Sequence, residues 1–371
     1  MGRLDKDIHQ KEMAIRFCLV NEMTPFLEVN VQNYRELSDV STVITDIDAL
    51  GVKIDPSGGT RKVIFDCKTL KNTSPINRAF WASGLMNFSD CNEAFIILKK
   101  NASEAHRLSA KQIGVHLFSE KQFNNYGQSC SIDFNTDYCY STCIDNWIKL
   151  EKSVKGNQQL EQFLTFLCNE IPLERDCVKA FRRFTTALKK AKGELDPQKP
   201  KHQAVFYFAL SIFAYLMSQI VHDLRNIVDF DSDEATFEKI LKYYIWGGRE
   251  GFTLKNNLQK VYYSSNPDAH PEIDSELKMN MWSDFIELCR NLLDSPTDIH
   301  KCINPSRELG LRVITDRDEN KDLYCKGIIE KSNRIRQFSS LMAVYLIGSA
   351  ELPKDFIEIV DSSFNELRYG I

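Results

Sequence analysis

Glycine and proline are scarce in this chain of 371 residues, which has 16 glycines and 11 prolines. Glycine is therefore about 4% of the residues, against ~7% in typical proteins. Because all-β folds depend on these residues in their many turns, the scarcity favours a helix-rich protein. The charges are nearly balanced, with 47 basic and 51 acidic residues and a formal net charge of −4. This balance excludes a generally basic nucleic-acid coat but leaves room for a local phosphate-binding groove.

The eleven cysteines lack the spacing of a zinc site. The chain has no C-x-x-C pair, and its closest cysteines, Cys139 and Cys143, have no histidine cluster beside them. The first residues mix charged with apolar side chains, unlike the apolar core of a secretory signal. An odd number of cysteines then fits reduced thiols better than a disulfide framework. We therefore expect an intracellular, cytoplasmic protein.

One apolar run is long enough to raise the question of a membrane. Residues 204–221 (AVFYFALSIFAYLMSQIV) contain no charged side chain, and their number lies at the lower edge for a membrane span. Ser211, Ser218 and Gln219 weaken the tendency to insert, and there is no second comparable run. A helix buried on all sides in a helical domain has the same pattern, and we expect this alternative.

The first third of the chain alternates between helix and strand patterns. Val40–Asp55 and Arg61–Thr69 are rich in β-branched residues, and the PSGGT turn between them has the paired glycines that a hairpin needs. The expected elements are a helix at 11–23, strands at 26–31, 40–55 and 61–69, a helix at 77–88, a strand at 93–100, a helix at 102–112, a strand at 114–119 and a helix at 120–126. A hairpin followed by βα units predicts a mixed sheet with helices on its faces.

Strand patterns largely disappear in the rest of the chain. Residues 128–150 are polar and dotted with cysteines, which indicates a linker or loop. Helix patterns follow at 157–168, 177–192, 204–224, 235–246, 276–293 and 335–347. We therefore expect an α/β domain over residues 1–127, a linker or loop over 128–150, and a mostly α-helical domain of unassigned role over 151–371.

The hairpin carries the clearest chemical pattern. Asp66 and Lys68 stand two apart in one strand and so project to the same face, and the turn brings Asp48 alongside them. Ile64 and Phe65 precede Asp66, so this location is not fully solvated, and unpartnered carboxylates there would be costly. A Mg²⁺ ion would resolve the conflict, because it takes carboxylates, waters and substrate phosphate as ligands. An adjacent lysine could then orient or deprotonate a water for phosphodiester hydrolysis.

These residues resemble the PD-(D/E)xK nuclease superfamily, whose fold is restriction-endonuclease-like. The motif stands as Asp48, Asp66 and Lys68, and the likeness covers about residues 11–126. The resemblance implies a Mg²⁺- or Mn²⁺-dependent DNA endonuclease in which Asp48, Asp66 and the Cys67 backbone carbonyl bind the metal and Lys68 positions the attacking water. Relatives often place a glutamate of the first helix near the metal, and Glu12 is the first candidate for it.

The pattern leaves alternatives open. Glu22 is the second choice for the helix glutamate, and Asp46 could replace Asp48 as the ligand because both share a strand face. A solvated strand face with an Asp48–Lys68 ion pair would also produce the pattern.

Candidate nucleic-acid contacts are less distinctive. Arg78 and Trp81 fall on the helix after the motif, where they could hold phosphate and stack on a base, although a surface arginine and a core tryptophan fit as well. A basic stretch further on could follow a DNA backbone or form a solvated helix face. Its candidates are Arg182, Arg183, Lys189 and Lys190.

The resemblance also points to bacterial restriction or phage-defence nucleases. DNA is the expected partner, a homo-oligomer or a partner protein could bind through the helical domain, and no membrane is expected. The alternative hypothesis is a catalytically inactive nuclease fold that serves as a nucleic-acid- or protein-binding module.

Overall fold

A computed structural model describes residues 4–33, 40, 42–55, 58–68, 74–266 and 276–369, with the side chain of Lys68 left aside. The chain begins with α1 (Ile8–Val20), β1 (Thr24–Gln32), β2 (Val43–Ile54) and β3 (Thr60–Lys68). These are followed by α2 (Pro75–Ser89), β4 (Glu93–Leu98), α3 (Glu104–Gln112), β5 (Val115–Ser119) and α4 (Glu120–Ser129). Every helix and strand expected before residue 127 is confirmed, with ends shifted by a few residues.

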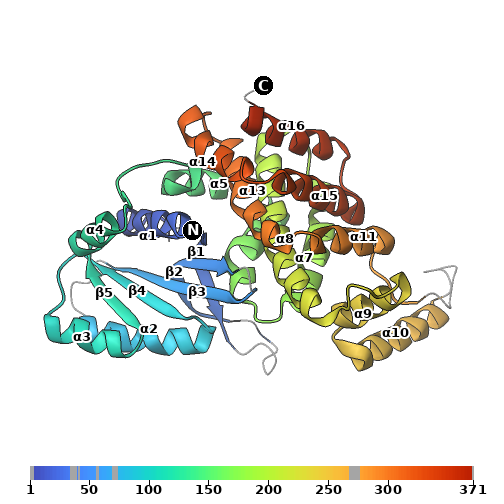
Figure 1. Cartoon of the computed structure of the whole chain (residues 1–371), viewed down its shortest axis with the longest axis horizontal. Helices are drawn as coiled ribbons and strands as arrows, with labels where there is room; N and C mark the ends of the chain where they lie inside the picture. The colour runs from blue at the N-terminus through green and yellow to red at the C-terminus, as the bar shows by residue number, and fades with distance from the viewer. Residues whose placement is uncertain are drawn as a thin grey trace.

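The five strands form one mixed sheet in the order β1-β2-β3-β4-β5. The pairs β1–β2 and β2–β3 are antiparallel, and β3–β4 and β4–β5 are parallel. Helices α1 and α4 cover one face of the sheet, and α2 and α3 cover the other (Figure 1). The predicted mixed sheet with flanking helices is therefore confirmed.

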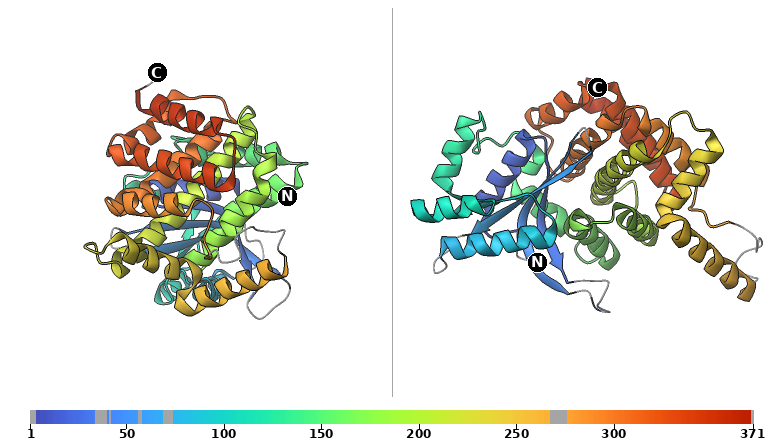
Figure 2. Two further views of the ribbon diagram at one scale, coloured as in Figure 1. Left: turned by 90° about the vertical axis from the view of Figure 1, so that its right-hand side faces the viewer. Right: turned by 60° about the horizontal axis from the view of Figure 1, so that its bottom comes forward.

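The remaining described residues are almost entirely helical. The longer helices are α5 (Ile144–Val154), α6 (Gln158–Thr165), α7 (Cys177–Ala191), α8 (Pro200–Ile227), α9 (Glu234–Trp246), α10 (Gly248–Ser265), α11 (Trp282–Leu293), α13 (Ile303–Arg312), α14 (Glu319–Ile329), α15 (Asn333–Ala350) and α16 (Asp355–Tyr369). Helix α10 projects from the body of this part (Figure 2). The prediction of a mostly helical C-terminal part is confirmed.

The segment expected as a linker or loop is packed into the fold. Tyr140, Ile144, Trp147 and Leu150 are buried, and α5 begins at Ile144. The Trp147 indole donates a hydrogen bond to the Ser141 carbonyl. The polar residues that suggested a loop lie around buried aromatic and aliphatic ones, so this segment connects the sheet to the helical part as a folded element.

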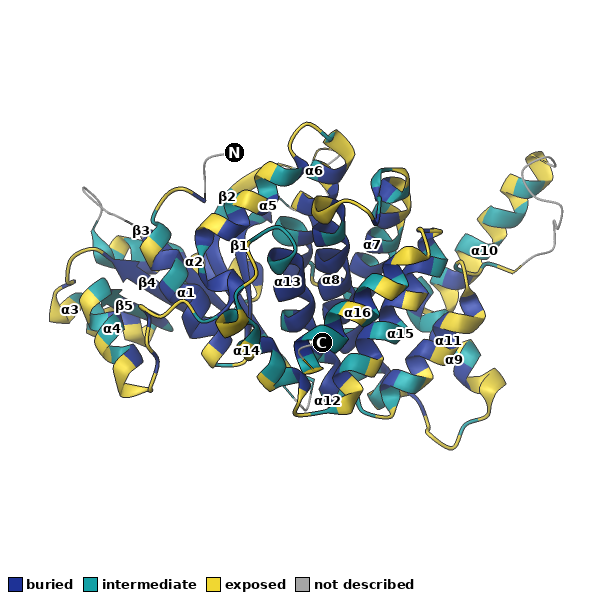
Figure 3. Cartoon of the chain, turned by 90° about the horizontal axis from the view of Figure 1, so that it is seen from above, coloured by how far each residue is buried: buried dark blue, intermediate teal, exposed yellow. Residues whose placement is uncertain are grey.

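Helix α8 lies at the centre of the helical part and contacts α7, α13 and α15. In the described residues it is the one helix long and apolar enough to cross a membrane, and 94% of its apolar window is buried in the structure. Figure 3 shows its buried surface among the surrounding helices. This burial agrees with the core-helix alternative.

The tip of the β2–β3 hairpin rests against α8. Gly58 has φ +90°, and a Cβ built there would lie 1.6 Å from Nδ1 of His222 on α8. Only glycine fits this contact, both for its backbone conformation and for the space. The helical part thus anchors the hairpin whose other end carries Asp48 and Asp66.

Candidate metal centre

Asp48 and Asp66 lie on neighbouring strands, as the hairpin predicts. Ala49 of β2 pairs with Phe65 of β3, so Asp48 and Asp66 follow at the next positions of the two strands. The Cys67 N–H donates a 2.8 Å hydrogen bond to Asp48 Oδ2. Both aspartates are buried, with 6% and 3% of their surface exposed. Lys68 ends β3, and its side chain lies outside the described residues.

The Cys67 backbone was expected to contribute its carbonyl oxygen to the metal. The contact seen in the structure is made by its N–H, which orients the Asp48 carboxylate. Cys67 lies beyond the last β2–β3 pair, Ala49–Phe65, and is paired with Ile97 of β4.

Three carboxylates meet beside this hairpin. One oxygen each of Glu28, Asp46 and Asp48 lies within 4.8 Å of the others, and we call these three residues the acidic group. Glu28 enters from β1, where its neighbours Leu27 and Val29 pair with Ala49 and Ile47 of β2. Asp46, considered from the sequence as an alternative to Asp48, thus lies together with it.

Glu28 is held in this group at an energetic cost. It has φ 51° inside a strand, a conformation that non-glycine residues rarely adopt. Burial raises its carboxyl pKa to about 7, although Lys11 beside it acts in the opposite direction. The Lys11 ammonium of α1 lies 2.5 Å from Glu28 Oε1, and the two side chains are 1% and 5% exposed. The other carboxylate oxygen, Oε2, is buried without a hydrogen-bond partner in the described part of the chain.

Asp66 is engaged by an arginine. The Arg78 Nε and Nη2 atoms of α2 each lie 2.5 Å from one oxygen of Asp66, which makes a bidentate pair. The guanidinium carbon lies 3.6 Å from the centre of the Trp81 ring. Burial by itself would lower the pKa of Arg78, but the hydrogen bonds and charge of Asp66 outweigh it and raise that pKa. Arg78 and Trp81 therefore border the site, as expected, but Arg78 binds a carboxylate.

The two candidate helix glutamates lie elsewhere. Glu12 Oε1 accepts a hydrogen bond of 3.1 Å from the Ile144 N–H at the start of α5, so Glu12 joins α1 to the helical part. Glu22 follows α1, is 71% exposed in its side chain and lies 3.6 Å from Lys53. Neither belongs to the acidic group. From α1 the structure brings Lys11 to the site, and the additional carboxylates come from β1 and β2.

The basic residues of α7 do not form one continuous track. Arg183 pairs with Glu170 and Glu174, and Arg182 donates to the Ile245 carbonyl. Lys189 lies 3.9 Å from Glu351, and Lys190 is exposed. Ion pairs within the chain thus engage two of the four candidates, Arg183 and Lys189.

Two cavities adjoin the acidic group along β1. One, of about 420 Å³, includes Glu28 and Asn30 and extends between β1, α5 and α6. The other, of about 410 Å³, runs from Asn30 toward α7 and includes Lys179 and Arg183. Asn30 pairs with Asp46 across the β1–β2 ladder and lines both cavities. A polymeric ligand bound along β1 would pass the acidic group.

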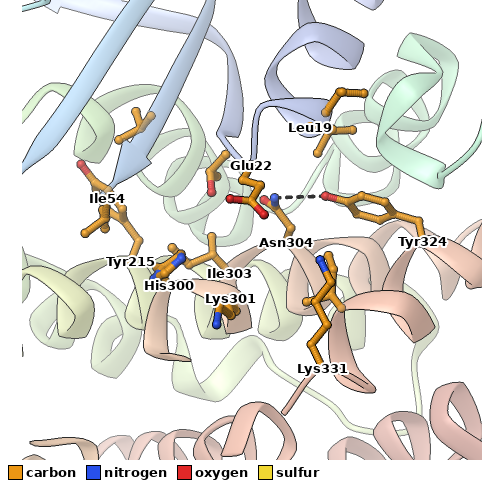
Figure 4. Close-up of a pocket in the computed structure, with 14 residues that line it drawn as sticks. Leu19, Glu22, Ile54, Tyr215, His300, Lys301, Ile303, Asn304, Tyr324 and Lys331 are labelled. Atoms are coloured by element: carbon orange, nitrogen blue, oxygen red, sulfur yellow. Dashed lines mark hydrogen bonds between the residues drawn. The ribbon is translucent and has the colours of Figure 1, made fainter. Parts of the chain in front are cut away.

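A further cavity of about 350 Å³ lies at the opposite end of β2, around Val52 and Ile54. Figure 4 shows its lining, in which Asn304 bonds the Tyr324 hydroxyl. Six residues of extended strand separate Asp48 from Ile54, which corresponds to roughly 20 Å. This cavity is therefore distinct from the acidic group.

The residues present fit a hard divalent cation. Mg²⁺ and Mn²⁺ prefer carboxylate oxygens, and the acidic group supplies three carboxylates with a fourth on the adjacent strand. Two unit charges 4.8 Å apart repel by about 3.5 kcal/mol at an effective dielectric constant near 20. Lys11 offers one positive charge to the group, so a cation would relieve the remaining repulsion and give the buried Glu28 Oε2 a partner.

Comparisons of the chain with protein-family models, with curated proteins and with solved structures find no match.

Proposed function

We propose that the chain is a Mg²⁺- or Mn²⁺-dependent endonuclease that hydrolyses DNA phosphodiester bonds. The observation that carries the proposal is the convergence of Asp48, Asp46 and Glu28, with Asp66 on the neighbouring strand. The order of helix, three antiparallel strands, helix and parallel strand supports it, because this is the arrangement that the PD-(D/E)xK resemblance implies.

Each residue of the site has its own role in this proposal. Asp48 and Asp66 hold the metal, and Glu28 and Asp46 complete the oxygen set from β1 and β2. A bound divalent cation would polarise the phosphate and lower the pKa of a coordinated water. The Cys67 N–H fixes the Asp48 carboxylate, and Lys68 orients the attacking water. Lys11 keeps a positive charge against Glu28.

The test is nicking of supercoiled plasmid DNA with Mg²⁺ and with Mn²⁺. We expect the wild type to nick. Asp48→Asn and Asp66→Asn, which remove metal ligands, and Lys68→Ala, which removes the group that orients the water, should lose activity by about a hundredfold or more. Asp231→Asn is the matched control, because Asp231 is an exposed aspartate in the loop before α9. Equal activity in all variants would remove the assigned site.

A second candidate is a non-catalytic nuclease fold that binds nucleic acid or protein. One observation favours it: Asp66 is already neutralised by Arg78, and Glu28 by Lys11, through contacts within the chain. Such pairs satisfy buried carboxylates without a metal. Calorimetry separates the two functions. Binding of Mn²⁺ that Asp48→Asn abolishes supports the nuclease, and a flat titration with and without DNA supports the binding module.

A further inference from the structure

The cavity between β1, α5 and α6 has a chemical character that the metal centre does not require. Its inner wall includes Glu28, whose buried Oε2 lacks a hydrogen-bond partner in the described residues. Its volume of about 420 Å³ falls in the range of small-molecule sites. A space of this size directly beside the acidic group is suited to one part of the proposed substrate.

The polar groups that line the cavity are mainly hydrogen-bond acceptors. Glu151 of α5 is half-buried, and no hydrogen bond or ion pair of its carboxylate is seen within the described ranges. Asn169 donates its Nδ2 to the carbonyls of Leu27 and Glu28, which leaves its Oδ1 as an acceptor. The two oxygens of the Glu151 carboxylate would be satisfied by a ligand that brings neighbouring N–H groups.

The walls of the cavity are apolar and partly aromatic. Trp147 and Leu150 of α5, Leu164 of α6 and Leu27 of β1 line it. Such walls hold a flat, weakly hydrated group better than a hydrated metal ion or a phosphate. The nearby carboxylates also repel phosphate in the absence of a cation.

We propose that this cavity is a nucleobase-binding subsite that prefers guanine. The Watson–Crick edge of guanine presents two neighbouring N–H donors, which match the two oxygens of the Glu151 carboxylate. Adenine presents one donor beside an acceptor, and the acceptor would face a carboxylate oxygen. Burial raises the pKa of Glu151, and the positive charge of Lys11 partly offsets this effect.

This inference rests on the proposed function, because the base would belong to the DNA strand that the protein cleaves. A base enters such a cavity from a single strand or after extrusion from a duplex, and extrusion costs unstacking energy. The subsite would therefore make cleavage depend on a guanine beside the scissile phosphate and favour unpaired DNA.

The experiment measures binding of guanosine, inosine and adenosine to the full chain by calorimetry without divalent metal. We expect guanosine to bind about tenfold or more tightly than adenosine. Inosine, which lacks the exocyclic amino group, should bind with intermediate affinity. Asp145→Ala, which removes an exposed acidic residue of the same helix, should leave this order unchanged.

Two variants make the test specific. Glu151→Ala should abolish the preference. Glu151→Gln, which places a donor beside an acceptor, should shift it toward adenosine, and circular dichroism confirms that both variants are folded. Equal affinities of the three nucleosides, no measurable binding, or a guanosine preference that persists in Glu151→Gln would overturn the proposal. Plasmid nicking is scored separately. Nicking without nucleoside preference refutes the subsite alone, whereas preference without nicking refutes the endonuclease and leaves the subsite.

Discussion

Asp48→Asn tests whether the acidic group is arranged for a cation. The asparagine can keep an oxygen in place to accept the hydrogen bond from the Cys67 N–H, so the hairpin is preserved. The substitution removes one of three negative charges that lie within 4.8 Å of one another. Two full charges at this separation repel by about 3.5 kcal/mol at an effective dielectric constant near 20, and attraction to Lys11 and the raised pKa of Glu28 both reduce this.

Without metal we therefore expect Asp48→Asn to be as stable as the wild type or up to roughly 2 kcal/mol more stable. For a chain of 371 residues the gain corresponds to a rise in Tm of up to about 3 °C, since an unfolding entropy of ~2.1 cal/mol/K per residue makes 1 kcal/mol equal to about 1.3 °C. With Mn²⁺ at about a hundred times its Kd, the wild type should gain about 2.7 kcal/mol, because the ion binds only the folded state. Asp48→Asn should gain almost nothing.

The assay is thermal unfolding followed by circular dichroism, first with a chelator and then along a Mn²⁺ titration. Asp231→Asn should follow the wild type in both series. Strong destabilisation of Asp48→Asn without metal would contradict this expectation, because the carboxylates would then not repel one another. The expectation is also refuted if this variant keeps the full gain from Mn²⁺.

Three other perturbations address the Arg78–Asp66 pair, the Gly58 contact and His300, which lines the cavity around Val52 and Ile54. Arg78→Ala leaves Asp66, which is 3% exposed, without its cationic partner and should lower the free energy of unfolding in urea by roughly 2–4 kcal/mol without metal. Mn²⁺ should restore part of the lost stability. An unchanged urea midpoint would contradict the pairing. Gly58→Ala should lower the free energy of unfolding by about 2 kcal/mol or more, because the new Cβ meets the His222 ring. The loss should be smaller in a His222→Ala background. Additive losses in the double variant would show that the two residues do not touch. Burial, with help from Lys301, lowers the pKa of His300 below its ordinary 6.5, so the neutral ring is favoured in the folded state. The stability that the neutral His300 ring contributes is complete above pH 6.5 and is lost as the pH falls below that value. His300→Gln should therefore lose less stability than the wild type between about pH 7 and pH 5. Parallel curves of stability against pH for the two proteins would contradict this.

The hairpin and the sheet were predictable because their signals are local. β-Branched runs on either side of a glycine pair specify two adjacent strands, and the two-residue period of a strand places Asp66 near Asp48. Glu28 was missed because its role depends on the pairing of β1 with β2, a long-range contact. A lone glutamate inside the apolar run FLEVNV was the signal that could have indicated it.

Lys11 and Arg78 show a second limit. A helix pattern predicts that α1 and α2 form. It does not predict which residues of α1 face the sheet, because that depends on packing. Lys11 is 1% exposed, which its charge alone does not suggest. The sequence predicts a linker or loop over residues 128–150 because polar residues and cysteines dominate this segment. Its burial is decided by Tyr140 and Trp147, which fill space between the two parts of the fold.

A crystal structure with Mn²⁺ and a short DNA duplex would show whether these carboxylates hold a divalent metal. We expect an anomalous scattering peak about 2 Å from an oxygen of Asp48 and from one of Asp66 or Glu28, with Arg78 displaced from Asp66. An intact Arg78–Asp66 pair in saturating Mn²⁺, with no peak beside the acidic group, would contradict it.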